Sequence, residues 1–303
     1  MKKKYLLVVV GPTAVGKTDL CLDLATYFHT EIISADARQF YQEMVLGTAK
    51  PSEEELSRVK HHLINNLSIH QNYNIAQFEK DVLQILDQAF QSHDIMILTG
   101  GSGLYVQAVC EGIDEMPSIP SALRASLNLQ YQEKGLVWLQ EEVKKLDPVY
   151  YEQVDRQNPQ RLIRALEVCL HTSKPFSDFR VKDKVERPFE IIKIGLTRPR
   201  EELYERIDHR MDLMIEAGLF EEAKSLYEHR ALNALQTVGY QEIFAHLEGK
   251  YDREEAIRLL KRNSRRYAKR QLTWFGKDES IHWFHPDQRQ EIIQWVKEEM
   301  EQT

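Results

Sequence analysis

The octapeptide GPTAVGKT, residues 11–18, has the residue types and spacing of a phosphate-binding loop. In the pattern G-x-x-x-x-G-K-[ST], the glycines let backbone N–H groups face a phosphate. The lysine adds a mobile positive charge, and the hydroxyl can ligate Mg²⁺. The loop therefore predicts binding of a nucleotide or another phosphate compound, with Thr18 as a Mg²⁺ ligand. Its residues are Gly11, Pro12, Thr13, Ala14, Val15, Gly16, Lys17 and Thr18.

Asp36 is the first candidate for acid–base chemistry. It follows residues 32–35, a short apolar stretch that predicts a strand, and Gln39 lies nearby. In a doubly wound sheet the ends of parallel strands meet at one edge, so Asp36 is expected beside the phosphate loop. A polar residue in this place can serve as a base or can cap a turn, and both interpretations stay open.

A third loop follows the apolar residues 95–99, which predict another strand. Its sequence, Gly100-Gly101-Ser102-Gly103, contains no carboxylate. Enzymes that hydrolyse a terminal phosphoryl group usually have an aspartate at this point to help hold Mg²⁺. An ordinary ATPase or GTPase is therefore disfavoured, whereas a small-molecule kinase is not excluded.

The strands and helices expected around these loops indicate an α/β protein with a P-loop parallel-sheet core. Residues 5–10 form an apolar, β-branched run that is typical of a strand buried on both faces, and residues 17–29 have helical periodicity. Acids, a glycine and two prolines mark a boundary at 111–121. We expect a core of residues 1–115 and 195–303, a helical insertion domain over 116–194, and C-terminal helices that pack back on the core.

Charge is unevenly distributed in this acidic protein, whose formal net charge is −7. Residues 258–271 contain seven basic side chains and no acid, and residues 156–200 contain eleven basic side chains, including Lys182 and Lys184, against five acids. Such zones are either solvated faces or contacts to a phosphate backbone. The three separated cysteines fit a reducing cytoplasm, and no apolar run approaches the ~20 residues that span a membrane.

Eight stretches in order along the chain resemble the tRNA dimethylallyltransferases, also called tRNA isopentenyltransferases. They are GPTAVGKT, ISADARQFY, LGTAKPS, LTGGSGLY, NPQRLIRALEV, RIDHRMDLMIEAGL, TVGYQEI and RRYAKRQLTWF. The resemblance implies transfer of a dimethylallyl group from dimethylallyl diphosphate to the exocyclic N6 amine of the adenine just 3′ of the anticodon. It implies Mg²⁺ as cofactor and a helical insertion that grips the tRNA anticodon stem-loop. We expect a monomeric, cytoplasmic enzyme without a membrane partner.

The resemblance also assigns residues. It implies that Asp36 and Ser102 are catalytic, that the loop residues Gly11 to Thr18 bind the donor, and that Arg210 adds to the donor site. Four positions depart from the family pattern, because Ala37-Arg38 stands where Ser-Met is common, and Ser102 and Ser264 stand where Thr is usual. The implied tRNA contacts are Asp36, Ala37, Arg38, Gln39, Ser102, Arg124, Gln160, Arg161, Leu162, Ile163 and Arg164.

Two rival functions remain. A P-loop small-molecule or nucleoside kinase would use Asp36 as a base toward a hydroxyl and would turn over ATP. A tRNA-binding protein with a nucleotide-responsive loop would bind tRNA without changing its mass. The basic zones disfavour the kinase, and the placement of Asp36 beside a second glycine loop disfavours the pure binder.

Overall fold

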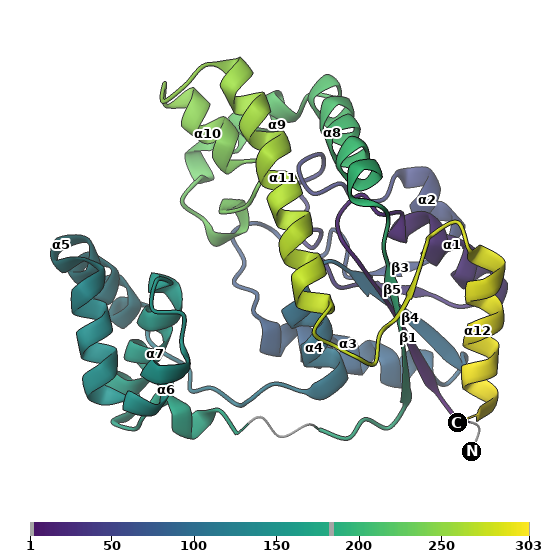
Figure 1. Cartoon of the computed structure of the whole chain (residues 1–303), viewed down its shortest axis with the longest axis horizontal. Coiled ribbons are helices and arrows are strands. Elements are labelled where there is room, and N and C mark those ends of the chain that lie inside the picture. Colours follow the sequence, from purple (N-terminus) through teal and green to yellow (C-terminus); the bar gives the residue numbers. More distant parts are fainter. Residues whose placement is uncertain (1–2, 182–184, 303) are drawn as a thin grey trace. The chain divides into compact units, whose positions relative to one another are not determined.

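The chain folds into two compact units, shown in the computed structural model of Figure 1. The sheet unit comprises residues 1–111 and 186–303, and the helical unit comprises residues 112–185. The structure describes residues 3–181 and 185–302, so Lys182 and Lys184 of the second basic zone lie outside the described residues.

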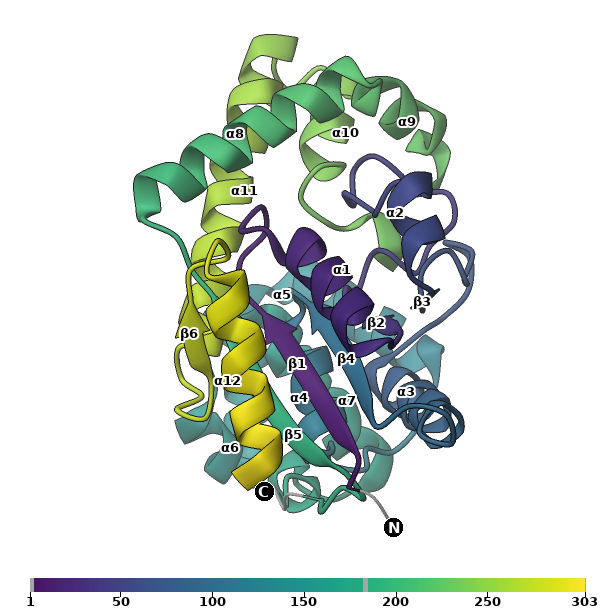
Figure 2. The ribbon, with the colours of Figure 1, turned by 90° about the vertical axis from the view of Figure 1, so that its right-hand side faces the viewer.

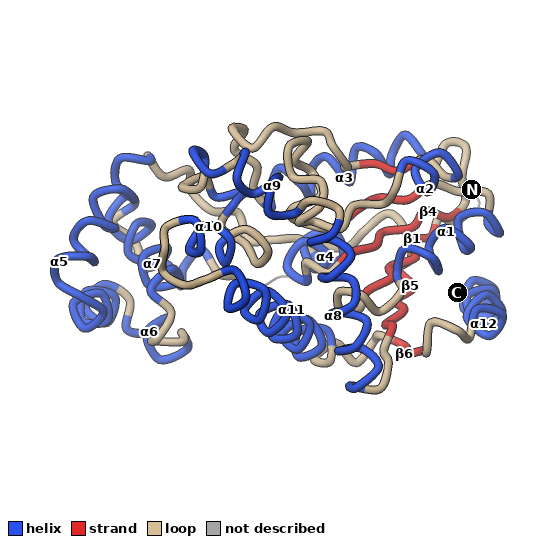
Figure 3. Tube along the Cα trace, turned by 90° about the horizontal axis from the view of Figure 1, so that it is seen from above, coloured by secondary structure: helices blue, strands red, loops and turns tan. Residues whose placement is uncertain are grey.

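Within the described residues, the sheet unit is built on six parallel strands in the order β3-β2-β4-β1-β5-β6. Figure 3 shows the strands side by side, seen from above. Because all strands run in one direction, their carboxyl ends lie at one edge of the sheet. The strands are β1 (Tyr5–Val10), β2 (Ile32–Ser34), β3 (His61–His62), β4 (Ile95–Gly100), β5 (Glu190–Leu196) and β6 (His282–Phe284).

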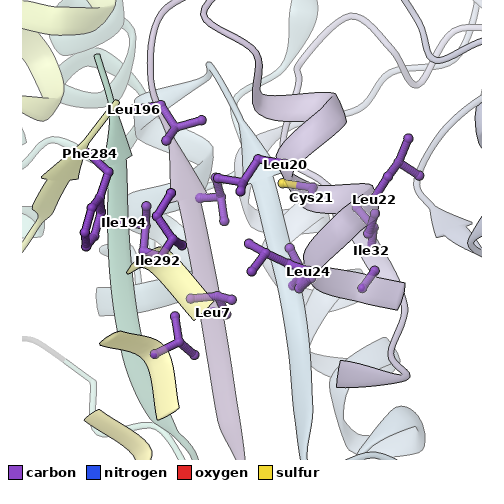
Figure 4. Close-up of a cluster of buried hydrophobic side chains, with 14 of the residues drawn as sticks. Leu7, Leu20, Cys21, Leu22, Leu24, Ile32, Ile194, Leu196, Phe284 and Ile292 are labelled. Atoms are coloured by element: carbon purple, nitrogen blue, oxygen red, sulfur yellow. The ribbon is translucent and has the colours of Figure 1, made fainter. Parts of the chain in front are cut away.

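Helices cover both faces of this sheet, and the alternation of side chains along β1 explains why. Leu7 and Val9 point into one apolar cluster, and Leu6 and Val8 point into another, because successive residues of a strand face opposite sides. Figure 4 shows the first cluster, in which Leu7 packs with side chains from α1 (Lys17–Phe28) and α12 (Arg289–Gln302). The same two helices lie in front of the strands in Figure 2.

The second face is covered by α3 (Ile75–Ala89) and α4 (Gly103–Glu111). A further apolar cluster joins helices beyond the carboxyl edge, including α8 (Arg200–Glu216) and α11 (Arg253–Phe275), with the loop that follows β2. The remaining helices of the sheet unit are α2 (Glu53–Arg58), α8 (Arg200–Glu216), α9 (Leu219–Ser225), α10 (Gln241–Leu247) and α11 (Arg253–Phe275), with the 3-10 turns η2 (Tyr227–His229) and η3 (Asn233–Leu235).

The helical unit has an apolar core of its own. Leu139, Leu162 and Leu166 lie in this core and are at most 1% exposed. Its elements are α5 (Ser121–Leu146), α6 (Pro148–Gln153), α7 (Pro159–Thr172) and the 3-10 turn η1 (Phe176–Phe179).

The α/β fold class with a parallel-sheet core is confirmed, and the strands expected at 5–10, 32–35 and 95–99 correspond to β1, β2 and β4. The expected start of the second core segment at 195 falls inside β5, which pairs with β1 from Glu190 onward. Glu190 and Lys193 interrupt the apolar pattern of this strand, so the sequence alone did not reveal where the strand begins. No helix in the described part of the chain is long and apolar enough to cross a membrane.

Candidate active site

The phosphate-binding loop connects β1 to α1 at the carboxyl edge of the sheet. Gly16 is the N-cap of α1 with φ of 112°, a left-handed conformation that glycine adopts without strain. No side chain caps this helix end, so its first N–H groups and the positive end of the helix dipole can meet an anion. The local backbone is therefore that of an anion site, as the motif predicts.

The side chain of Lys17 contacts the backbone of the phosphate-binding loop. Its ammonium donates hydrogen bonds to the carbonyls of Gly11 at 3.0 Å and Pro12 at 2.8 Å. Burial, followed by the nearby charge of Arg210, lowers the pKa of Lys17 to about 8, and Asp36 opposes the shift. A bound diphosphate would replace these neutral carbonyls by full negative charges, which favour the protonated ammonium.

Two arginines of α8 approach the same loop. The guanidinium of Arg210 donates to Thr13 Oγ1, and Arg206 Nε donates to the Ala14 carbonyl at 2.9 Å. Burial lowers the pKa of Arg210, and Asp36 counteracts this effect. Sequence reasoning assigned Arg210 but missed Arg206, although the two are four residues apart and therefore lie on one face of a helix. It also missed Arg198, whose Nε donates to the Val15 carbonyl at 2.8 Å.

Asp36 follows β2 and faces the cavity, and it also makes a local turn. Its Oδ1 accepts the backbone N–H of Arg38 at 2.9 Å. Both interpretations left open by the sequence are therefore compatible, because one carboxylate oxygen caps the turn while the side chain lines the cavity. Gln39 Nε2 reaches the carbonyls of Thr48 and Ala49 at 3.4 and 3.3 Å and ties this turn to the next loop.

Ser102 connects the loops that follow β4 and β2. Its Oγ accepts the N–H of Ala37 at 3.0 Å. Burial and the charge of Asp36 raise the pKa of Tyr267 to about 12, while a hydrogen bond with Ser102 lowers it. Ser102 holds the backbone beside Asp36 and is not among the described residues that line the cavity, and its catalytic role stays a prediction.

The loop 45–47, part of the LGTAKPS stretch, is fixed by a residue that sequence reasoning missed. The carboxylate of Glu222 accepts the N–H groups of Val45 at 3.1 Å, Leu46 at 2.8 Å and Gly47 at 3.0 Å. It also accepts the hydroxyl of the fully buried Tyr240 at 2.6 Å. One carboxylate therefore sets the course of the chain that leads to the cavity wall at Thr48 and Ala49.

These elements enclose a cavity of about 350 Å³, within the range of small-ligand sites. The phosphate loop contributes Thr13, Ala14, Gly16, Lys17 and Thr18 to its lining, whereas Gly11, Pro12 and Val15 are not among the lining residues that the structure describes. The other lining residues are Asp19, Cys21, Ser34, Asp36, Gln39, Thr48, Ala49, Pro51, His61, Ile64, Thr99, Gly100, Gly101, Arg206, His209, Arg210 and Leu213.

A divalent cation would find oxygen ligands here. The Thr18 hydroxyl lines the cavity at the start of α1, and such a hard oxygen donor suits Mg²⁺. Across residues 3–181 and 185–302, no group of three or more His, Cys, Asp or Glu side chains is arranged to hold a metal. The residues therefore fit a cation that takes most of its ligands from diphosphate and water.

In the helical unit, two of the implied tRNA contacts share one buried acid. The Glu167 carboxylate, 1% exposed, accepts bonds from Arg124 Nε and Nη2, both at 2.7 Å, and from Arg164 Nη1 at 2.6 Å. The side chains of Leu162 and Ile163 are buried in the core of the unit. The implied contact segment of α7 thus offers the exposed side chains of Gln160 and Arg161 and the half-buried Arg164.

The basic zone on α11 is partly neutralised. Lys261 pairs with Asp212 and Arg265 pairs with Asp208, both on α8, and Arg258 pairs with Glu255 on its own helix. These pairs reduce the charge available to a nucleic acid, so part of this zone serves to hold α11 against α8. Arg266, Lys269 and Arg270 are exposed.

Comparisons with known proteins agree on one family. A profile described as IPP transferase matches residues 39–278. The chain is 50% identical over 297 residues to tRNA dimethylallyltransferase 1 of Bacteroides fragilis (strain YCH46), covering 98% of this chain and 99% of the relative. It is also 50% identical over 299 residues to tRNA dimethylallyltransferase of Cytophaga hutchinsonii, covering 99% of this chain and 98% of that protein.

Solved structures give the same result. The crystal structure of full-length tRNA isopentenylpyrophosphate transferase from Bacillus halodurans is 36% identical with a TM-score of 0.74, covering 99% of this chain and 98% of that one. A eukaryotic dimethylallyltransferase acting on tRNA is 25% identical with a TM-score of 0.76, covering 93% of this chain and 74% of that one. Since profile, sequences and structures match across most of its length, the chain belongs to the IPP transferase family.

Proposed function

We propose that the protein transfers a dimethylallyl group from dimethylallyl diphosphate to N6 of the adenine just 3′ of the anticodon in tRNA, releasing diphosphate. The observation that carries the proposal is a cavity with two chemically different sides. The phosphate loop, Lys17 and Arg210 form a cationic side, and the Asp36 carboxylate lines the same space. Membership of the family adds independent support.

The cationic side suits the leaving group. When the bond between the allylic carbon and the diphosphate oxygen breaks, its electron pair leaves with the diphosphate. Lys17, Arg210 and the amides at the start of α1 then face the growing negative charge. Mg²⁺, which we propose as cofactor with Thr18 as its protein ligand, would neutralise part of that charge when bound.

The carboxylate suits the acceptor. The exocyclic amine of adenine is a weak nucleophile, because its lone pair is delocalised into the ring, and it must lose a proton as the carbon–nitrogen bond forms. Asp36 can orient the amine and accept that proton, while its Oδ1 stays fixed by the Arg38 N–H. The base has to leave its stack to enter a protein cavity, as in other enzymes that modify bases.

A kinase fits this site less well. The exposed cations Arg266, Lys269 and Arg270 suit a nucleic-acid acceptor better than a small molecule, and the relatives that match nearly the full chain are tRNA dimethylallyltransferases. We further propose a monomeric, cytoplasmic enzyme whose helical unit contacts the anticodon stem-loop. Its buried, unbridged cysteines Cys21, Cys110 and Cys169 are consistent with that compartment.

Mass spectrometry of nucleosides tests the reaction. Unmodified tRNA with adenine 3′ of the anticodon is incubated with the protein, Mg²⁺ and dimethylallyl diphosphate, then digested to nucleosides. The expected result is a gain of one C5H8 unit on that adenosine. An unchanged tRNA mass with intact donor would contradict the proposal, and a phosphorylated small molecule in parallel reactions with ATP would favour the kinase.

Substituting Arg161 tests the helical unit. Arg161→Ala is expected to weaken tRNA binding about equally for different tRNA sequences and to lower the slope of log affinity against log salt by about 1, because it removes one phosphate contact. The KM for the donor should not change. Fluorescence titrations at several salt concentrations measure the slope, with the exposed Lys145→Ala as control on the same unit. An unchanged slope for Arg161→Ala would exclude this contact.

A further inference from the structure

Gln271 on α11 bridges two loops of the active site. The residue is 4% exposed. Its Oε1 accepts the backbone N–H of Thr13 at 2.8 Å, and its Nε2 donates to the carbonyl of Gly101 at 3.0 Å. Only one orientation of the amide satisfies both bonds, because a backbone N–H can only donate and a carbonyl can only accept.

The fit of this amide is tight. A Cβ added to Gly101 would lie 2.0 Å from Gln271 Nε2, so the loop needs glycine at this point for the amide to reach its carbonyl. Both of the bridged residues line the cavity. The amide therefore contacts the backbone of the cavity wall while remaining shielded from water itself.

The two loops carry different parts of the proposed reaction. Thr13 begins the donor-facing part of the phosphate loop and is also held by Arg210. Gly101 precedes Ser102, whose hydroxyl holds the Ala37 amide next to Asp36. One buried amide thus connects the loop that faces the leaving group to the loop that supports the base.

We propose that Gln271 is a positioning residue that fixes the distance between the diphosphate loop and the loop that supports Asp36. This inference deepens the proposed function and rests on it. Each loop keeps its own contacts to donor or tRNA without the amide, so both KM values should change little. The alignment of the allylic carbon with the amine depends on both loops at once, so the effect should fall on kcat.

Two substitutions separate positioning from packing. Gln271→Met keeps the volume but makes neither hydrogen bond. Gln271→Glu keeps the shape, and its protonated form can still accept from Thr13 and donate to Gly101. Its ionised form has no donor for the Gly101 carbonyl. Burial raises the pKa of a carboxyl group, so the protonated form should be populated at the lower end of the assay range.

Steady-state kinetics with both substrates tests the proposal. Gln271→Met is expected to lower kcat by about 10- to 100-fold with both KM values within about threefold of wild type. The kcat of Gln271→Glu divided by that of wild type should fall as pH rises, because the ionised carboxylate has no donor for Gly101. This ratio removes the effect of ionisations that both enzymes share. The exposed Gln107→Met on α4 is the matched control and should retain wild-type kcat.

The outcomes are distinct. Partial recovery of kcat by Gln271→Glu at low pH, absent in Gln271→Met, supports positioning even where Gln271→Met is less stable. A kcat of Gln271→Met within about twofold of wild type overturns the inference. A Gln271→Glu ratio that rises with pH overturns it as well, because the ionised form lacks the donor for Gly101. In both cases an active wild-type enzyme leaves the proposed function standing, whereas wild-type protein that does not prenylate tRNA overturns both.

Discussion

Asp36→Asn is expected to lower kcat by about 10²- to 10⁴-fold, the range that general bases contribute. The substitution is selective because Asn keeps an Oδ1 that can accept the Arg38 N–H, so the turn after β2 should persist. The lost property is proton acceptance. Single-turnover kinetics of tRNA prenylation at saturating tRNA and donor measures the chemical step directly, so a change in tRNA affinity does not enter the measured rate.

Asp155→Asn is a suitable control for this prediction. Asp155 makes the same kind of turn, with its Oδ1 accepting the N–H of Gln157 at 3.1 Å, but it lies in the helical unit. Its substitution should leave the single-turnover rate unchanged. If Asp36→Asn retained the wild-type rate, the proton would have to pass to the departing diphosphate or to water, and Asp36 would only cap its turn.

The parts of the fold that the sequence predicts are those encoded by contiguous patterns. The apolar run of β1, the glycine loop and the helical period of α1 adjoin one another, and each is recognisable without the rest of the chain. The strand β5 differs, because Glu190 and Lys193 break its apolar pattern. Its place beside β1 is determined by pairing with a strand from the start of the chain, far away in the sequence.

Those residues of the candidate site that belong to a recognisable motif could be predicted from the sequence. Asp36 and Lys17 follow from motif and strand order. Arg206 could have been found from its helical spacing to Arg210. Gln271 and Glu222 could not, because their roles depend on backbone groups at least 170 residues away in the chain, which no local pattern reveals.

The resemblance to a family and the amphipathic pattern of α7 give different information about one segment. The resemblance assigns residues 160–164 as a block to tRNA contact. The helical period places Leu162 and Ile163 in the apolar core, since they share a face with Leu166. Combining both leaves Arg161 as the exposed cation of this block, which is why it is the one we propose to substitute.

Lys17→Met is expected to lower kcat/KM for the donor by about 10²- to 10³-fold, comparable to the loss of one donor from an oxyanion site. Methionine keeps the length of the side chain but removes the charge that faces the leaving diphosphate. The exposed Lys80→Met on α3 is the control and should not affect kcat/KM. A Lys17→Met enzyme with wild-type kcat/KM would show that Arg210 and the loop amides suffice.

The pH dependence of the wild-type enzyme gives an independent check on Lys17. Because its pKa in the free protein is about 8, kcat/KM for the donor should fall above pH 8 as the ammonium is lost. Stability should change in the opposite direction. The unfolded chain, in which Lys17 regains its ordinary pKa of 10.5, binds more protons between pH 8 and 10.5, so Lys17 should make the folded state more stable as pH rises through that window. Lys17→Met should lose the fall of kcat/KM above pH 8. It should lose only part of the stability gain, because burial lowers the pKa of Lys50 to about 8 as well. A fall of kcat/KM above pH 8 that persists in Lys17→Met would assign it to another group.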